Sequence, residues 1–241
     1  MPDLSARATA PPEPPPPGTL PPRVALRRTR GPQAAALAGL AGFAGIFGLV
    51  KARRSEAADI ALMIRWQAFR HPSLARIMTV VSWPGFPPQS RIIPPALMAA
   101  MFLVRLRLEA FTMLLAWGTG GLSSVLKGIM RRPRPVAGTD LRVVAAPLGG
   151  SSFPSGHVIV YTGTYGWLAY LAHTLIKPRW PRRVIVGTLT GLVAAVGPSR
   201  IYQGHHWPTD VAASYLLGTS YVLGLGAIYR RLKERRVHET A

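Results

Sequence analysis

Hydrophobic residues gather in six long runs along this chain, and polar and basic residues fill the connections between them. A helix rises about 1.5 Å per residue, so roughly 20 residues cross a hydrocarbon layer about 30 Å thick. Four runs are close to that length, whereas the second and fifth are shorter and carry prolines. The pattern predicts an all-α membrane helix bundle with six transmembrane helices, or five if one short run does not span. The runs are Gln33–Val50, Ile92–Val104, Leu108–Leu126, Val158–Ile176, Val184–Pro198 and Val211–Tyr229.

The two ends of the chain differ from this apolar centre. Eight of the twelve residues 11–22 are proline, which makes the segment too stiff and polar to join a hydrophobic core. We expect a disordered cytoplasmic tail at 1–31, a membrane domain at 32–230 and a basic cytoplasmic tail at 231–241. The N-terminus has no short apolar core followed by a small-residue cleavage site, so no cleaved signal peptide is expected.

A shorter segment between the first two runs, Ala58–Ser82, has apolar residues at helical spacing. Leu62, Trp66 and Phe69 recur along it, with arginines between them. A basic, Trp-containing amphipathic helix is typical of the headgroup region of a bilayer, so interfacial helices are expected beside the spans. The same pattern also fits an ordinary loop helix packed on the bundle, and the sequence leaves both alternatives open.

The charge balance separates this chain from soluble basic proteins. Its formal net charge is +20 and its pI is about 11.7, yet 49% of residues are hydrophobic and the mean hydropathy is +0.21. A nucleic-acid-binding protein carries its cations on one face of a fold, whereas here they lie at the ends of apolar runs. We therefore expect a phospholipid bilayer and a membrane lipid as partners, and no nucleic acid. Cysteine is absent, which excludes disulfides, thiolate metal sites and a cysteine nucleophile.

We expect a multi-pass protein of the cell (inner) membrane, and the distribution of lysine and arginine predicts its orientation. Span parity places two basic turns and the basic C-terminal tail on one side, which we expect to be cytoplasmic. The opposite side also carries cations, such as Lys51, Arg53 and Arg132, that topology does not explain, so an anionic target is expected there. The cytoplasmic set comprises Arg105, Arg107, Lys177, Arg179, Arg182, Arg183, Arg230, Arg231, Lys233, Arg235 and Arg236.

Histidines and a carboxylate, together with further cations, are predicted to converge on the extracytoplasmic side. One group precedes the fourth run and the other follows the fifth. Because the fourth run leaves this side and the fifth returns to it, both groups are expected at one rim of the bundle. They comprise three cations, two histidines and one carboxylate: Lys127, Arg134, His157, Arg200, His206 and Asp210.

These residue types match what a phosphoryl group requires. Lysine supplies a point charge and arginine a planar fork for phosphate oxygens. Ser155 and Gly156 precede the fourth run, where free N–H groups at a helix start favour an anion and glycine permits its close approach. Asp210 follows His206 by four residues, so its carboxylate can accept one ring N–H and leave the other nitrogen as a nucleophile.

Each group also has a simpler structural explanation. Cations at the end of a span snorkel to headgroups, serine and glycine cap helices, and an acid at a helix start matches the helix dipole. Adjacent histidines at a membrane interface are often wetted aromatic side chains. Three such coincidences at one rim are a weaker explanation than a single anion site.

The spacing of these groups resembles the tripartite signature of the type 2 phosphatidic acid phosphatase superfamily. The three motifs match without a gap or a substitution, and the span pattern from about residue 33 to 229 fits bacterial six-helix members. Both tails lie outside the resemblance. The matching residues are Lys127, Arg134 and Pro135, then Pro154, Ser155, Gly156 and His157, then Ser199, Arg200, His206 and Asp210.

The resemblance implies a membrane phosphatase that acts through a phosphohistidine and without a cofactor. His206 would attack phosphorus, Asp210 would hold its ring, and His157 would protonate the leaving oxygen. His205 lies at a position that the motif leaves open and is assigned no role. Because the reaction needs one neutral and one protonated histidine, a bell-shaped pH profile is expected. Phosphate would be bound by Lys127, Arg134 and Arg200 and by the backbone N–H groups of Ser155 and Gly156.

No metal ion is expected, because no second carboxylate accompanies Asp210 and the two histidines are needed for the reaction. Vanadium haloperoxidases share this pocket within the superfamily but are soluble. A lipid phosphotransferase would use the same intermediate and pass phosphate to an alcohol. A non-catalytic anion transporter would also gather cations at a rim, although no charged residue lies deep inside the last three runs.

The substrate is less sharply defined than the reaction. A site at the membrane rim indicates a lipid whose phosphate lies at the surface. Undecaprenyl diphosphate, phosphatidic acid and phosphatidylglycerophosphate all fit, with the polyprenyl diphosphate first by analogy. The sequence does not specify the oligomeric state.

Overall fold

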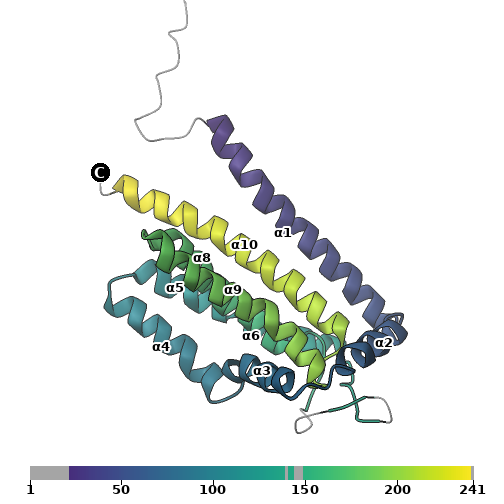
Figure 1. The fold of residues 1–241 in the computed structure, drawn as a ribbon. Coiled ribbons are helices and arrows are strands. Elements are labelled where there is room, and N and C mark those ends of the chain that lie inside the picture. The colour runs from purple at the N-terminus through teal and green to yellow at the C-terminus, as the bar shows by residue number, and fades with distance from the viewer. Residues whose placement is uncertain (1–21, 139–140, 144–148, 240–241) are drawn as a thin grey trace, which may run out of the picture.

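The computed structural model of this chain describes residues 22–138, 141–143 and 149–239. These residues form helices and contain no strand, which confirms the all-α fold class. The long helices lie side by side, so that most connections gather at two opposite ends of the molecule (Figure 1). The elements are α1 (Pro22–Lys51), α2 (Glu56–Gln67), α3 (Pro72–Ser82), η1 (Trp83–Gly85), α4 (Gln89–Leu103), α5 (Arg107–Trp117), α6 (Thr119–Met130), α7 (Gly156–Tyr161), η2 (Thr162–Gly166), α8 (Trp167–Leu175), α9 (Arg179–Tyr202) and α10 (Pro208–Glu239).

Three helices among the described residues are each long and apolar enough to cross a membrane: Gly31–Lys51, Arg179–Tyr202 and Pro208–Arg235. They contain the first, fifth and sixth predicted runs. The second run lies in α4, the third in α5 and α6, and the fourth in the consecutive segments α7, η2 and α8. The count of six spans is therefore not confirmed and stays a prediction.

Helices extend past both predicted domain boundaries. α1 begins at Pro22, so residues 22–31 are helical where the sequence predicts the end of a disordered tail. Proline suits the first turn of a helix because its missing N–H has no partner to lose there. α10 continues to Glu239, because residues 231–239 contain no proline or glycine to end it. The predicted tail residues 1–21 lie outside the described residues.

The predicted amphipathic segment forms α2 and α3, and both pack on α9. Trp66 Nε1 donates a hydrogen bond to Pro198 O at 2.9 Å, and the hydroxyls of Ser82 and Ser199 lie 2.7 Å apart. α2 therefore packs on the bundle through the face that carries Trp66, as expected of a loop helix. Leu62 and Phe69 remain exposed beside it.

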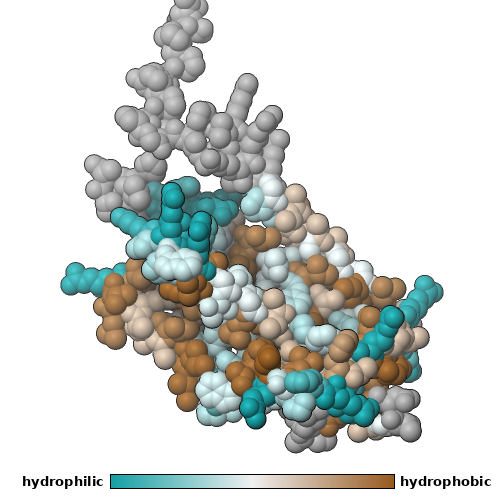
Figure 2. Space-filling view, in the orientation of Figure 1, coloured by the Kyte–Doolittle hydropathy of each residue, from teal (hydrophilic) through white to brown (hydrophobic). Residues whose placement is uncertain are grey.

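An apolar belt lies between two polar ends of the molecular surface (Figure 2). Large aliphatic side chains are exposed along the helices; Leu37, for example, is 67% exposed and Val125 62%. Inside the bundle, the buried Glu109 of α5 accepts hydrogen bonds from Tyr229 Oη at 2.7 Å and Lys233 Nζ at 2.9 Å on α10. An apolar belt facing the lipid, with an inward carboxylate satisfied by hydrogen bonds, is an arrangement that suits a bilayer.

Two glycines permit close approaches between elements, one in the α9–α10 connection and one in η2. Gly204, in the α9–α10 connection, has φ of +78°, and a Cβ there would meet Arg142 O at 2.2 Å. In η2, a Cβ on Gly163 would meet Ala116 O and Thr119 Oγ1, both at 2.5 Å. Any larger residue therefore strains these contacts.

Gly163→Ala should destabilise the protein by about 1–3 kcal/mol, because the added methyl group overpacks the contact of η2 with α5 and α6. The midpoint of thermal unfolding in detergent measures this effect. Gly166→Ala is the matched control, since a Cβ at Gly166 meets nothing within 4 Å. An equal loss of stability in both variants would contradict the packing explanation.

Candidate active site

The ends of four helical segments meet at one end of the bundle and bring the three motifs together. Lys127 lies in the last turn of α6, and the extended segment after it carries Arg134. His157 lies in the first turn of α7, Arg200 in the last turn of α9, and His206 just before α10. The structure thus brings the residues of the three motifs to one end of the bundle, as the sequence predicts. Residues 139–140 and 144–148, between the first two motifs, lie outside the described residues.

The ring of His206 is buried and held in one tautomer. Its Nδ1 lies 2.8 Å from Ser152 O, so Nδ1 carries the proton and donates it to this carbonyl. Its Nε2 is therefore unprotonated, and the lone pair of this nitrogen accepts a hydrogen bond from Arg134 Nη1 at 3.3 Å. This is the geometry that a nucleophilic imidazole needs, with the unprotonated nitrogen facing a cation.

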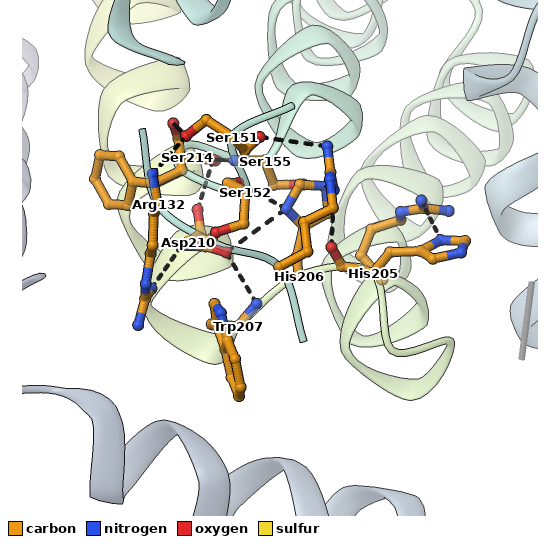
Figure 3. Close-up of polar contacts among 12 residues, drawn as sticks. Arg132, Ser151, Ser152, Ser155, His205, His206, Trp207, Asp210 and Ser214 are labelled. Carbon is orange, nitrogen blue, oxygen red and sulfur yellow. Dashed lines mark hydrogen bonds and ion pairs between the residues drawn. The ribbon is translucent and has the colours of Figure 1, made fainter. Parts of the chain in front are cut away.

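The predicted hydrogen bond from His206 to Asp210 is replaced by the one to Ser152. The Asp210 Oδ2 atom lies 3.6 Å from His206 Nδ1, within range of electrostatic attraction but beyond a hydrogen bond. The same oxygen accepts from the backbone N–H of Trp207 at 2.9 Å (Figure 3). Asp210 therefore caps α10 from its own first turn and keeps a negative charge near the ring.

Lys127 and Arg134 converge on a single backbone carbonyl. Lys127 Nζ donates to Ser151 O at 2.7 Å, and Arg134 Nη2 donates to the same oxygen at 3.3 Å. Arg134 Nη1 also donates to His205 O at 2.9 Å. Among the described residues, these two cations are held by carbonyls and form no salt bridge with a carboxylate, so their charge is available to an anion.

The charge of this cluster shifts the titration of its members. Burial and the neighbouring Arg134 charge lower the pKa of Lys127, one residue past the predicted third run, to about 8. Burial and then the charges of Arg200, Lys127 and Arg134 hold the pKa of His206 well below its ordinary value. His206 is therefore neutral at neutral pH, as a nucleophile must be.

Arg200 is fully buried and contacts His205, the histidine to which the motif assigns no role. Its Nη2 meets His205 Nδ1, and its Nη1 donates to Gln203 Oε1 at 2.8 Å and Ser82 Oγ at 3.2 Å. The guanidinium also lies 4.9 Å from the ring centroid of Phe86. The sequence missed these supporting residues, because they come from separate segments and carry no motif of their own.

His157 lies beside Phe86, with ring centroids 4.7 Å apart, and its Nε2 is buried with no hydrogen-bond partner among the described residues. Burial, and then the charge of Arg200, hold the pKa of His157 well below its ordinary value. The sequence predicts a protonated His157, whereas these surroundings favour the neutral ring. An anion bound among the cations would raise this pKa by offsetting their charge.

The predicted role of the Ser155 backbone is not supported by the geometry. Its N–H donates to Ser214 Oγ at 2.8 Å and is therefore already engaged (Figure 3). Gly156, which begins α7, is better placed to contact a phosphate held by Lys127. A Cβ on Gly156 would lie only 3.8 Å from Lys127 Cε, so its backbone is close to that side chain. Of the two predicted backbone donors, the geometry favours Gly156.

A buried arginine that the motif does not specify joins two carboxylates at the start of α10. Arg132 Nη1 lies 2.6 Å from Asp210 Oδ1, and Arg132 Nη2 lies 2.6 Å from Asp59 Oδ2 (Figure 3 draws the first contact). Asp59, from α2, also accepts from Thr209 N and Thr209 Oγ1, both at 2.8 Å. This bridge fixes α2 and the start of α10 relative to His206. The one signal in the sequence for this bridge was Asp59, the acid in the otherwise basic amphipathic segment Ala58–Ser82.

Within the part of the chain that the structure describes, no group of three or more His, Cys, Asp or Glu side chains is arranged to hold a metal ion. The absence of a cofactor stays a prediction. The side chains that could neutralise a phosphate in place of a metal are Lys127, Arg134 and Arg200.

Together these features define a class: a helical membrane protein with a buried imidazole facing an uncompensated cation cluster, which is a site for a phosphoryl group. The model of the PAP2 superfamily matches residues 105–234. The chain belongs to the PAP2 superfamily, which confirms the resemblance read from its motifs.

Relatives of known name agree with this membership. The chain is 32% identical over 170 residues to phosphatidylglycerophosphatase B of Bacillus subtilis (strain 168), covering 68% of this chain and 79% of the relative. It is 36% identical over 100 residues to an undecaprenyl-diphosphatase of Sulfolobus acidocaldarius, covering 41% of this chain and 44% of that relative. The crystal structure of a transmembrane PAP2-type phosphatidylglycerolphosphate phosphatase from Bacillus subtilis matches with a TM-score of 0.71 and 25% identity, covering 81% of this chain and 96% of that chain.

Arg132→Lys should lower kcat about tenfold or more with little change in KM, because lysine cannot hold two carboxylates in one fixed geometry. Loss of one charge-assisted hydrogen bond should also lower the free energy of unfolding by about 1.5–3 kcal/mol. Steady-state kinetics and thermal unfolding measure the two effects. Arg65→Lys, an exposed arginine on α2, is the control. Wild-type kcat in Arg132→Lys would show that the bridge does not position the site.

The alkaline limb of the pH profile should report Lys127. Its ammonium is charged below its pKa of about 8 and neutral above it, so kcat/KM should fall as pH rises through about 8. In Lys127→Arg this limb should move to higher pH, since a guanidinium stays charged, although the absolute rate is lower. Initial rates between about pH 6 and pH 10 provide the test. An unchanged limb in the variant would assign it to another group.

Proposed function

We propose that this chain is a membrane phosphatase that removes the terminal phosphate of a lipid phosphate or diphosphate through a phosphohistidine on His206. The observation that carries the proposal is the orientation of the His206 ring. Its Nδ1–H is engaged by Ser152 O at 2.8 Å, and its Nε2 faces Arg134 Nη1 at 3.3 Å. An anion that binds Arg134 would take over this N–H and leave the lone pair of Nε2 facing phosphorus.

In the first step, Nε2 attacks phosphorus, and the bond between phosphorus and the oxygen of the lipid leaving group breaks. Lys127, Arg134 and Arg200 neutralise the charge on the phosphoryl oxygens, which is the main requirement of phosphoryl transfer. The ring becomes positively charged, and the carboxylate of Asp210, 3.6 Å from Nδ1, stabilises that charge. His157 gives its proton to the leaving oxygen.

In the second step, water attacks the phosphohistidine, and the bond between phosphorus and Nε2 breaks. His157, now neutral, accepts a proton from this water and is ready for another cycle. The protonated His157 that the first step needs arises when the bound phosphate offsets the surrounding cations, because the pKa of the ring is low without an anion. Phosphate leaves, and His206 returns to its neutral state.

The position of the site supports a lipid as the substrate. The reacting groups lie at one end of the bundle, where an apolar belt meets a polar end (Figures 1 and 2). A lipid can keep its chain in the hydrocarbon layer there while its phosphate reaches the cations. The basic α4–α5 and α8–α9 turns lie at the opposite end, which supports a cytoplasmic side there and an extracytoplasmic site in the inner membrane.

The purified protein in detergent should release phosphate from farnesyl diphosphate, phosphatidic acid or phosphatidylglycerophosphate in the presence of EDTA. His206→Ala should abolish release, because removal of the nucleophile leaves no group to form the covalent intermediate. Substrate labelled with ³²P should label the wild-type protein at an acid-labile, base-stable site and should not label His206→Ala. Release that requires added metal, or labelling that persists in His206→Ala, would refute the proposed mechanism.

A further inference from the structure

A cavity adjoins the candidate active site on the side of α1. Its volume is about 520 Å³, within the range of about 300–1,000 Å³ that is usual for small-molecule sites. Lys51, at the end of α1, lines one side, and the segment that follows α6 lines the other. Arg134 belongs to the lining, and its Nη1 lies 3.3 Å from His206 Nε2. A group bound in the cavity would therefore be the neighbour of a phosphate at His206.

The cavity carries more positive charge than its acids can balance. Of the described residues, Lys51, Arg53, Arg131 and Arg134 line it together with a single acid, Glu56. The acid is already paired, since Arg53 Nε lies 2.7 Å from Glu56 Oε1. Among the described residues, neither Lys51 nor Arg131 forms a salt bridge with a carboxylate. The cavity thus attracts an anion in addition to the one at His206.

Apart from Arg132, the rest of the lining is apolar. Val50, Met130 and Val136 contribute aliphatic surface, and the indole of Trp207 closes one side. Arg132 also lines the cavity, but its charge is held by Asp59 and Asp210 at 2.6 Å each. A combination of unpaired cations with aliphatic walls suits an anionic group that is attached to carbon atoms, as in a lipid headgroup.

We infer that this cavity binds a second, non-reacting phosphate of the substrate, so that the preferred lipids carry two phosphates, one to be cleaved at His206 and one retained. The inference rests on the proposed function and narrows it. Lipid diphosphates and phosphatidylglycerophosphate have this second group, whereas phosphatidic acid has only the phosphate that reacts. An anionic headgroup of the surrounding bilayer is the competing occupant, and it would affect all substrates alike.

Two pairs of substrates test the inference: farnesyl diphosphate against farnesyl monophosphate, and phosphatidylglycerophosphate against phosphatidic acid. In Lys51→Gln/Arg131→Gln, kcat/KM for the two-phosphate member of each pair should fall about tenfold or more, because two charge-assisted contacts are lost. The one-phosphate members should change less than about twofold, which also shows that the variant folds. Arg54→Gln/Arg91→Gln removes two exposed cations outside the cavity and serves as the control for net charge.

A binding measurement separates this inference from the proposed reaction. The non-hydrolysable methylene diphosphonate of farnesol should bind the wild-type protein more tightly than farnesyl phosphonate does, and the Lys51→Gln/Arg131→Gln variant should lose this preference. Titration calorimetry in detergent gives both affinities. If no lipid is hydrolysed but the preference depends on Lys51 and Arg131, the proposed reaction fails and the second site stands. Equal losses for one-phosphate and two-phosphate ligands, or no loss for either, would overturn the second site.

Discussion

The structure depends on one electrostatic constraint: three cations are held together at the end of a helix bundle, and no carboxylate of the described residues forms a salt bridge with any of them. Lys127 and Arg134 are anchored to the carbonyl of Ser151, and Arg200 lies among uncharged side chains and His205. Asp210, whose charge acts on Lys127 and Arg134, is already paired with Arg132 at 2.6 Å. Burial of unpaired charge is costly, so the pocket is stabilised when an anion enters it.

The same constraint sets the chemistry of the two histidines. A cluster of positive charge favours the neutral form of each ring, which suits His206 as a nucleophile. It opposes the protonated form of His157 until a phosphate offsets the charge. Substrate binding and preparation of the general acid are therefore coupled through the field of the cations. This coupling explains how His157 can donate a proton although the cations around it favour its neutral form.

A second arrangement keeps the nucleophile in position. The start of α10 is capped from two sides, by Asp210 of its own first turn and by Asp59 of α2, and Arg132 joins the two carboxylates. α2, whose pattern fits either a helix resting on the membrane surface or a loop helix packed on the bundle, is thereby part of the site. The motif spacing could not reveal this, because the run from Lys127 to Arg134 contains adjacent arginines that look equivalent in sequence. Arg131 is exposed and lines the neighbouring cavity, whereas Arg132 turns inward to the acids.

The sequence by itself determined the all-α class, the apolar runs, the family and the six side chains that meet at one rim. It could do so because hydrophobic length and span parity are properties of the linear chain, and because the motif residues keep fixed spacings. Only the tertiary structure decided which atoms pair. His206 donates to Ser152 rather than to Asp210, the Ser155 N–H is taken by Ser214, and Arg132 bridges Asp59. Such pairings join residues far apart in the chain and depend on how helices pack, so no local pattern encodes them.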